Sequence, residues 1–270
     1  MFLSLASILF YLVATALLGF RLSSVSLSRS NGIQVGLFGS SILGAALHGA
    51  ALYELTLTSS GFNLGFFPAM SLISWGIVLV LLMGAMVRPL ENLGILVLPL
   101  AAMTVAMALV YPGRHMLPEG MGLGVKIHIV LSILAASVLA IAAFQSVFLA
   151  FQERSLRRKR LRKIFGIFPP LRTQESILFQ LIGVGFFLLS LSLVSGMTFL
   201  NDMFVQHLAH KTVLSVFAWV VFAGLLWGRW RYGWRGRRII RWSLMGFVTL
   251  MLAYFGSKLV LEIILGRAWY

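Results

Sequence analysis

The chain has 270 residues, of which 60% are hydrophobic and only 11% are charged. A soluble globular protein carries about 25% charged residues, so this composition leaves no room for a sizeable soluble domain. The chain lacks cysteine, which excludes disulfides and thiolate metal sites. The net charge of +15 could indicate nucleic-acid binding. In a membrane protein, however, Lys and Arg collect in cytoplasmic loops, and we prefer that interpretation.

Apolar runs of about 20 residues recur along the whole chain, and each is long enough to cross about 30 Å of hydrocarbon. We therefore predict an all-α, polytopic membrane helix bundle with about eight transmembrane helices. The first run lacks a positive n-region and a small-residue cleavage site, so we interpret it as a retained helix. The expected spans are about 2–21, 32–54, 68–87, 94–111, 124–150, 176–198, 211–229 and 239–264.

The basic residues are unevenly divided between the two sides of these spans. Loops that follow odd-numbered spans hold 17 of the 22 Lys and Arg residues, which places those loops in the cytoplasm and both termini outside. We expect a single transmembrane domain over residues 1–270, with a basic cytoplasmic loop at about 151–175. That loop is either an amphipathic helix on anionic lipid or a solvated segment. A stretch from Trp227 to Arg238 alternates aromatic residues with arginine, typical of an interfacial belt.

The histidines are the main candidates for chemistry, since imidazole is a common ligand of metals and of haem iron. On the predicted topology all five lie in the outer half of the membrane or in outer loops. His48 lies past the middle of the second span, His128 near the outer start of the fifth. His207 and His210 precede the seventh span at i, i+3. Each of these four could instead be a structural or interfacial polar residue, and we interpret His115 as a solvated loop residue.

Several stretches together resemble the CcsA-type cytochrome c assembly proteins, and in particular their short YpjD-like branch. The resemblance covers about residues 40–265. It rests on LHGAALY around His48, GFFPAMSLISW, the long run KIHIVLSILAASVLAIAAFQSVFLAFQE that contains His128, GFFLLSLSLVSG, and KTVLSVFAWVVFAGLLWGRWRYGWRGRR with the later GFVTLMLAYFGSK.

The resemblance implies a multi-pass protein of the bacterial inner membrane that binds haem at its outer face, with other cytochrome c maturation proteins and membrane lipid as partners. The distribution of charge argues against nucleic acid as a partner. The resemblance also implies that His48 and His128 are ligands of the haem iron, and His207 or His210 are candidates for a further outer ligand. The family's tryptophan-rich signature is missing at residues 208–212, and Trp227 stands where a second intramembrane histidine is expected. We therefore do not expect a full haem ligase, and no catalytic residue is assigned.

Two other functions remain open on the sequence. The chain could be a non-catalytic scaffold or regulator of haem metabolism that has lost the full haem path, as in the related HemX-like proteins. It could also be a small-molecule transporter, because Lys258, Glu262 and His48 are ionisable residues in or near predicted spans. A transporter would bind its substrate near the membrane midplane between discontinuous helices.

Overall fold

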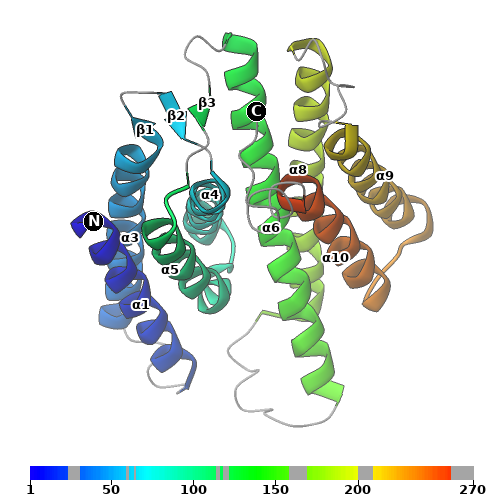
Figure 1. Ribbon diagram of the computed structural model, residues 1–270. Coiled ribbons are helices and arrows are strands. Elements are labelled where there is room, and N and C mark those ends of the chain that lie inside the picture. The colour runs from blue at the N-terminus through cyan, green and yellow to red at the C-terminus, as the bar shows by residue number, and fades with distance from the viewer. Residues whose placement is uncertain are drawn as a thin grey trace. The chain divides into compact units, whose positions relative to one another are not determined.

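The computed structural model describes residues 1–23, 31–58, 61–63, 65–113, 116–117, 122–157, 169–199 and 209–256. These residues contain eight helices that are long and apolar enough to cross a membrane, which confirms the predicted all-α membrane bundle. Figure 1 shows these helices in chain order, from blue at the N-terminus to red at the C-terminus. The position of both termini outside the membrane stays a prediction.

The chain forms two compact units, and the first consists of residues 1–116 and 148–174. Its transmembrane helices are α1 (Phe2–Ser23), α3 (Asn31–Thr56), α4 (Phe66–Val87) and α5 (Gly94–Val110). Helix α1 packs against α3 and α5, and α4 packs against the same two helices, so the four form a closed ring. The single domain expected over residues 1–270 stays a prediction.

A largely buried ion pair ties α1 to the turn between α4 and α5. The Nη2 atom of Arg21, at the end of α1, lies 2.7 Å from Oε1 of Glu91 in the short 3₁₀ helix η1 (Glu91–Leu93). The two side chains are 11% and 20% exposed. Within the described residues, the second guanidinium nitrogen of Arg21, Nη1, is buried without a hydrogen-bond partner. The pair therefore holds two charges away from water at one end of the ring.

The second unit consists of residues 117–147 and 175–270. It contains most of α6 (Leu123–Arg157) and α8 (Leu171–Phe199), together with α9 (Ala209–Tyr232) and α10 (Arg237–Met251). A short π-helix, η2 (Leu252–Gly256), continues α10. Side chains link these helices: Ser146 on α6 donates a hydrogen bond to Ser243 on α10, and Phe186 on α8 stacks on Trp219 of α9.

Two helices are longer than the apolar runs that predict them. Helix α6 has 35 residues, which at about 1.5 Å per residue is roughly 50 Å and exceeds the hydrocarbon thickness. It continues through polar residues to Arg157, and α8 already begins at Leu171, directly after Pro169 and Pro170. The predicted loop at 151–175 is therefore helical at both ends, because polar helix formers extend a helix beyond its apolar part. Residues 158–168 lie outside the described part of the chain.

A small three-stranded sheet joins the helices of the first unit, which the all-α expectation did not include. Its strands are β1 (Leu57–Thr58), β2 (Gly61–Asn63) and β3 (Met116–Leu117), in the order β1–β2–β3. Strands β1 and β2 are antiparallel, with Leu57 opposite Phe62. The Asn63 side chain donates to the carbonyl oxygens of Pro112 and Gly113, at 3.2 and 3.1 Å. These bonds connect the end of β2, just before α4, to the residues that follow α5.

Breaking the Arg21–Glu91 pair should destabilise the protein. We expect Arg21→Met or Glu91→Gln to lower the free energy of unfolding by about 3 kcal/mol, because either change leaves one buried charge unpaired. The midpoint of thermal unfolding in detergent measures the effect. Arg88→Gln, which alters an exposed arginine nearby, is the control. The double variant Arg21→Met/Glu91→Leu should recover much of the loss, and single variants as stable as the control would contradict the interpretation.

Candidate functional site

His48 lies on the inward face of α3 because of the helical spacing of its neighbours. The buried positions Leu37, Ser41, Gly44 and Ala45, together with His48, recur at intervals of three or four residues. Such spacing places side chains on one face of a helix. Gly44 leaves room for the ring of Tyr11 on α1, since a Cβ atom at this position would lie 2.9 Å from that ring. His48 is 1% exposed.

Both ring nitrogens of His48 have hydroxyl partners. The hydroxyl of Tyr11 lies 3.1 Å from Nδ1, and the hydroxyl of Ser71 on α4 lies 2.9 Å from Nε2. A neutral imidazole donates from one nitrogen and accepts at the other, and a hydroxyl can do either, so the two contacts satisfy the ring completely. Either nitrogen would have to release its partner before it could bind a metal ion.

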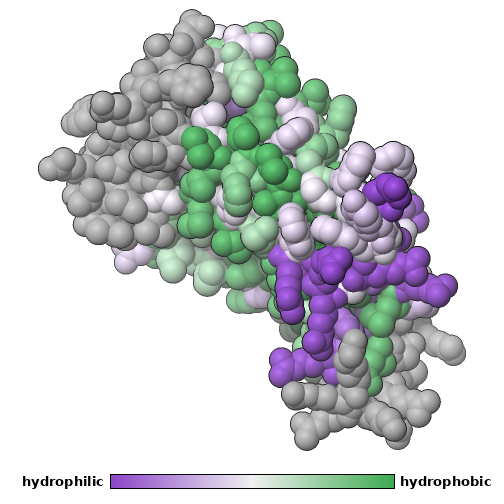
Figure 2. Space-filling view, turned by 90° about the vertical axis from the view of Figure 1, so that its right-hand side faces the viewer, coloured by the Kyte–Doolittle hydropathy of each residue, from purple (hydrophilic) through white to green (hydrophobic). Residues whose placement is uncertain are grey.

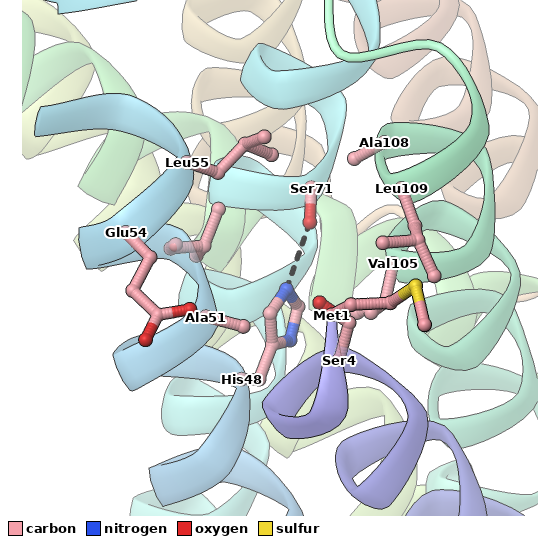
Figure 3. A pocket seen from close by; sticks show the side chains of 11 residues that line it. Met1, Ser4, His48, Ala51, Glu54, Leu55, Ser71, Val105, Ala108 and Leu109 are labelled. Carbon is pink, nitrogen blue, oxygen red and sulfur yellow. Dashed lines mark hydrogen bonds between the residues drawn. The ribbon is translucent and has the colours of Figure 1, made fainter. Parts of the chain in front are cut away.

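A pocket opens beside the His48–Ser71 hydrogen bond (Figure 3). Its volume is about 230 Å³, and it is lined by the start of α1, the last part of α3, Ser71 of α4 and the last part of α5. Met1, Ser4, His48 and Glu54 lie around it together with apolar side chains such as Leu109. Sites for small molecules usually measure roughly 300–1,000 Å³. The pocket is therefore too small for a whole haem as it stands.

His128 on α6 has a different set of partners, all in the second unit. Its Nδ1 atom lies 2.9 Å from the backbone oxygen of Ser192 and 3.1 Å from the hydroxyl of Ser195, both on α8. A carbonyl oxygen only accepts hydrogen bonds, so Nδ1 carries the proton and Nε2 holds the lone pair. The hydroxyl of Ser132 lies 3.5 Å from Nε2, at the outer limit of a hydrogen bond.

The neighbours of His128 are themselves fixed by hydrogen bonds. The hydroxyls of Ser132 and Ser192 lie 2.6 Å apart, and Tyr254 of the π-helix η2 donates to the backbone oxygen of Ser132 at 3.0 Å. Histidines that bind metals usually donate their second ring nitrogen to a carbonyl or carboxylate, which fixes the tautomer and the ring orientation. His128 has this arrangement, so its side chain fits an axial ligand of haem iron, whereas His48 in its present contacts does not.

The structure describes each of the predicted ligands His48 and His128 within its own unit. His48 belongs to the first unit and His128 to the second, and the pocket at His48 does not include His128. Over the described ranges, no three His, Cys, Asp or Glu side chains are grouped as a metal site. His210 lies in the first turn of α9, but its side chain is outside the described part, as is all of His207. His115, Lys258 and Glu262 also lie outside the described residues.

Trp227, which stands where the resemblance expects a second intramembrane histidine, does not point into the helix packing. Its side chain is 56% exposed and packs edge to face against Trp230, with ring centroids 5.2 Å apart. The departure from the family pattern at this position therefore leaves an outward-facing aromatic residue and no interior ligand.

The sequence interpretation missed the residues that hold the two histidines. Tyr11 and Ser71 were not singled out for His48, nor were Ser192, Ser195 and Tyr254 for His128. Each is a polar side chain in a strongly apolar run, and such a side chain needs a partner within the bundle. That signal marks the residues as inward-facing, but it does not tell which helix supplies the partner.

These observations define an integral membrane protein whose described helices form two units. Each unit contains one hydrogen-bonded histidine within its helices, His48 in the first and His128 in the second. The chain belongs to the family described as "Cytochrome C assembly protein", whose model matches residues 35–265. The described residues hold eight apolar spans, and with the family membership this identifies a bacterial inner membrane protein.

Its relatives differ in how much of the chain they cover. Inner membrane protein YpjD of Escherichia coli strain K12 is 34% identical over 231 residues, covering 83% of this chain and 86% of the relative. An uncharacterized 28.8 kDa protein of Azospirillum brasilense is 31% identical and covers 85% of this chain and 86% of its own length. Cytochrome c biogenesis protein CcsA of Trichormus variabilis is 29% identical over 100 residues, 36% of this chain and 28% of the relative. No solved structure matches the chain significantly.

Removing either hydroxyl partner of His48 should destabilise the first unit. We expect Tyr11→Phe and Ser71→Ala each to lower the free energy of unfolding by about 1–3 kcal/mol, because a buried ring nitrogen is left without a partner. Thermal unfolding in detergent measures both. Thr15→Val, which removes a hydroxyl bonded only within α1, is a matched control. In the background of His48→Leu the two changes should matter much less, and equal effects in both backgrounds would refute the pairing.

Proposed function

We propose that this protein binds haem and takes part in cytochrome c assembly, or a related haem process, at the outer face of the inner membrane. The observation that carries the proposal is the orientation of His128. Its Nδ1 atom donates to the Ser192 carbonyl, which leaves the lone pair on Nε2 for a ligand. Iron of a bound haem takes an imidazole nitrogen as its axial ligand. The family membership supports the same function.

In this proposal the residues around His128 position the ring. The carbonyl of Ser192 and the hydroxyl of Ser195 hold Nδ1 from one side. Ser132 is buried next to Nε2 and is fixed by Ser192 and Tyr254, so the polar groups near the ligating nitrogen keep defined places. Pre-organised ligands of this kind bind a metal more tightly than mobile ones.

His48 is the second proposed ligand, and it can bind iron only after one of its hydrogen bonds has broken. Its Nε2 atom borders the 230 Å³ pocket together with Ser71, so release of the Ser71 hydroxyl would free this nitrogen toward the pocket. The pocket would also have to widen, because it is smaller than a typical cofactor site. His207 and His210 stay candidates for an outer ligand.

Haem binding can be measured on the purified protein in detergent by absorption spectroscopy. We expect added haem to give a shifted Soret band, and His128→Ala to weaken binding by at least about tenfold, since second-sphere changes alone reach that size. His115→Ala is the matched control. The variant His128→Gly should regain the band when free imidazole is supplied. A band that is absent in the wild type, or unchanged in His128→Ala and in His48→Ala/His128→Ala, contradicts the proposal.

The second candidate function is a non-catalytic scaffold or regulator of haem metabolism. The observation that favours it is the complete hydrogen bonding of His48, which makes this residue a satisfied structural histidine in the ring of four helices. Under this alternative His48 serves the fold, and no histidine has to bind haem. Both candidates agree with membership of the family.

A cellular experiment separates the two functions. In a strain that lacks this protein, c-type cytochromes are quantified by haem staining after complementation with wild type, His128→Ala or His115→Ala. Haem binding predicts that His128→Ala restores less c-type cytochrome than the control, at equal amounts of protein in the membrane. A scaffold predicts full restoration by every histidine variant, together with a protein partner captured by crosslinking.

A further inference from the structure

The turn between α9 and α10 carries a dense group of arginines. We call residues 228–241 the basic turn. Its exposed arginines are Arg231, Arg235, Arg237, Arg238 and Arg241. Figure 2 shows a strongly hydrophilic band on this face of the molecule beside an apolar surface. Lys and Arg collect in cytoplasmic loops because they set the orientation of the helices in the membrane. A binding site requires in addition that the arginines are held in a fixed arrangement.

The backbone of the basic turn is held in one shape. Gly233 and Gly236 both have φ of +62°, a conformation that favours glycine. The backbone NH of Gly236 donates to the carboxylate of Glu175 on α8 at 3.0 Å. Arg229 donates to the backbone oxygen of Trp234 at 3.2 Å and lies over the ring of Phe179, 4.7 Å from its centroid. Glu175 and Arg229 therefore fix the turn from two sides.

Within the described part of their own unit, Arg231, Arg235 and Arg238 have little negative charge near them. Glu175 is the one acidic residue in the described part of the second unit, and Gly236 already donates to it. Arg238 lies over the ring of Trp234, 5.1 Å from its centroid. Arg231 lies 5.9 Å from the ring of Tyr232. These contacts orient the guanidinium groups and leave their charge uncompensated, which suits an anionic ligand.

Exposed aromatic side chains beside these arginines show at which depth the turn lies. Trp230 is 76% exposed, Tyr232 67% and Trp227 56%, all at the end of the membrane-spanning helix α9. Large aromatic rings of this kind are enriched where the membrane meets water, at the level of the lipid headgroups. The guanidinium groups next to them therefore lie at the level of lipid phosphates, a position that an acidic protein partner would not require.

We propose that the basic turn is a binding site for the phosphate of an anionic phospholipid, with Arg231, Arg235 and Arg238 as its ligands. Arginine suits this role because its planar group can donate two parallel hydrogen bonds to one phosphate. Arg237 makes a further contact of its own and is not one of these ligands. The proposal is independent of haem binding. It concerns the binding of particular lipids by the helix bundle.

Native mass spectrometry tests the site on the full-length protein in neutral detergent. The probes are phosphatidylglycerol and phosphatidylcholine with identical acyl chains. We expect the wild type to prefer phosphatidylglycerol, and Arg231→Gln/Arg235→Gln/Arg238→Gln to lose that preference by about fivefold for each arginine removed, as expected for about 1 kcal/mol each. The control Arg88→Gln/Lys126→Gln/Arg154→Gln removes the same charge from exposed positions outside the basic turn and should keep the preference.

Each outcome decides the proposal. An equal loss in both triple variants would show that only net charge matters, and no preference in the wild type would show that there is no site; either overturns it. Binding of polyglutamate without a preference for phosphatidylglycerol would assign the turn to an acidic protein partner and would also overturn it.

A second measurement covers the case in which the triple variant does not fold. Four tryptophans, Trp227, Trp230, Trp234 and Trp242, lie in or next to the basic turn. In wild-type protein in liposomes, brominated phosphatidylglycerol should therefore quench tryptophan fluorescence more than brominated phosphatidylcholine does. Equal quenching by the two lipids contradicts the proposal without use of any variant.

Discussion

A polar side chain inside a membrane must find its hydrogen-bond partner within the protein, and this constraint organises both helix units. Serine and threonine meet it locally, as Ser40 does by donating to the backbone oxygen of Gly36 one turn earlier. The rings of His48 and His128 instead take partners from neighbouring helices. His48 forms hydrogen bonds with α1 and α4, and His128 forms one with α8. Each histidine therefore links helices that lie side by side.

The two histidines are alike in the sequence, and the structure separates them by the chemistry of their partners. His48 faces two hydroxyls, which can each donate or accept, so its tautomer is open and both nitrogens are engaged. His128 faces a carbonyl oxygen, which accepts only, so one tautomer is imposed. A side chain with a fixed tautomer and an available lone pair is suited to coordination. One with two interchangeable hydroxyl partners is suited to holding helices together.

The sequence predicts the spans well because each is a local property: about 20 apolar residues form a helix in a membrane whatever surrounds them. It also identifies His48 and His128, since ionisable residues in such runs are conspicuous. Their partners could not be predicted, because Tyr11 and Ser71 lie 37 and 23 residues from His48 and are chosen by helix packing. The same limit applies to the extension of α6 to Arg157, where hydropathy ends before the helix does.

The order of the partners along the chain has a consequence for biogenesis. A ribosome makes Tyr11 before His48, so when α3 enters the bilayer its histidine already has one partner on α1, and Ser71 follows with the next helix. His128 has no such advantage, because Ser192 and Ser195 are made 64 and 67 residues later. During translation the Nδ1 proton of His128 lacks these acceptors until α8 has been made. The ring of α1, α3, α4 and α5 can thus close while the nascent chain is still growing, and the second unit closes only after its later helices have left the translocon.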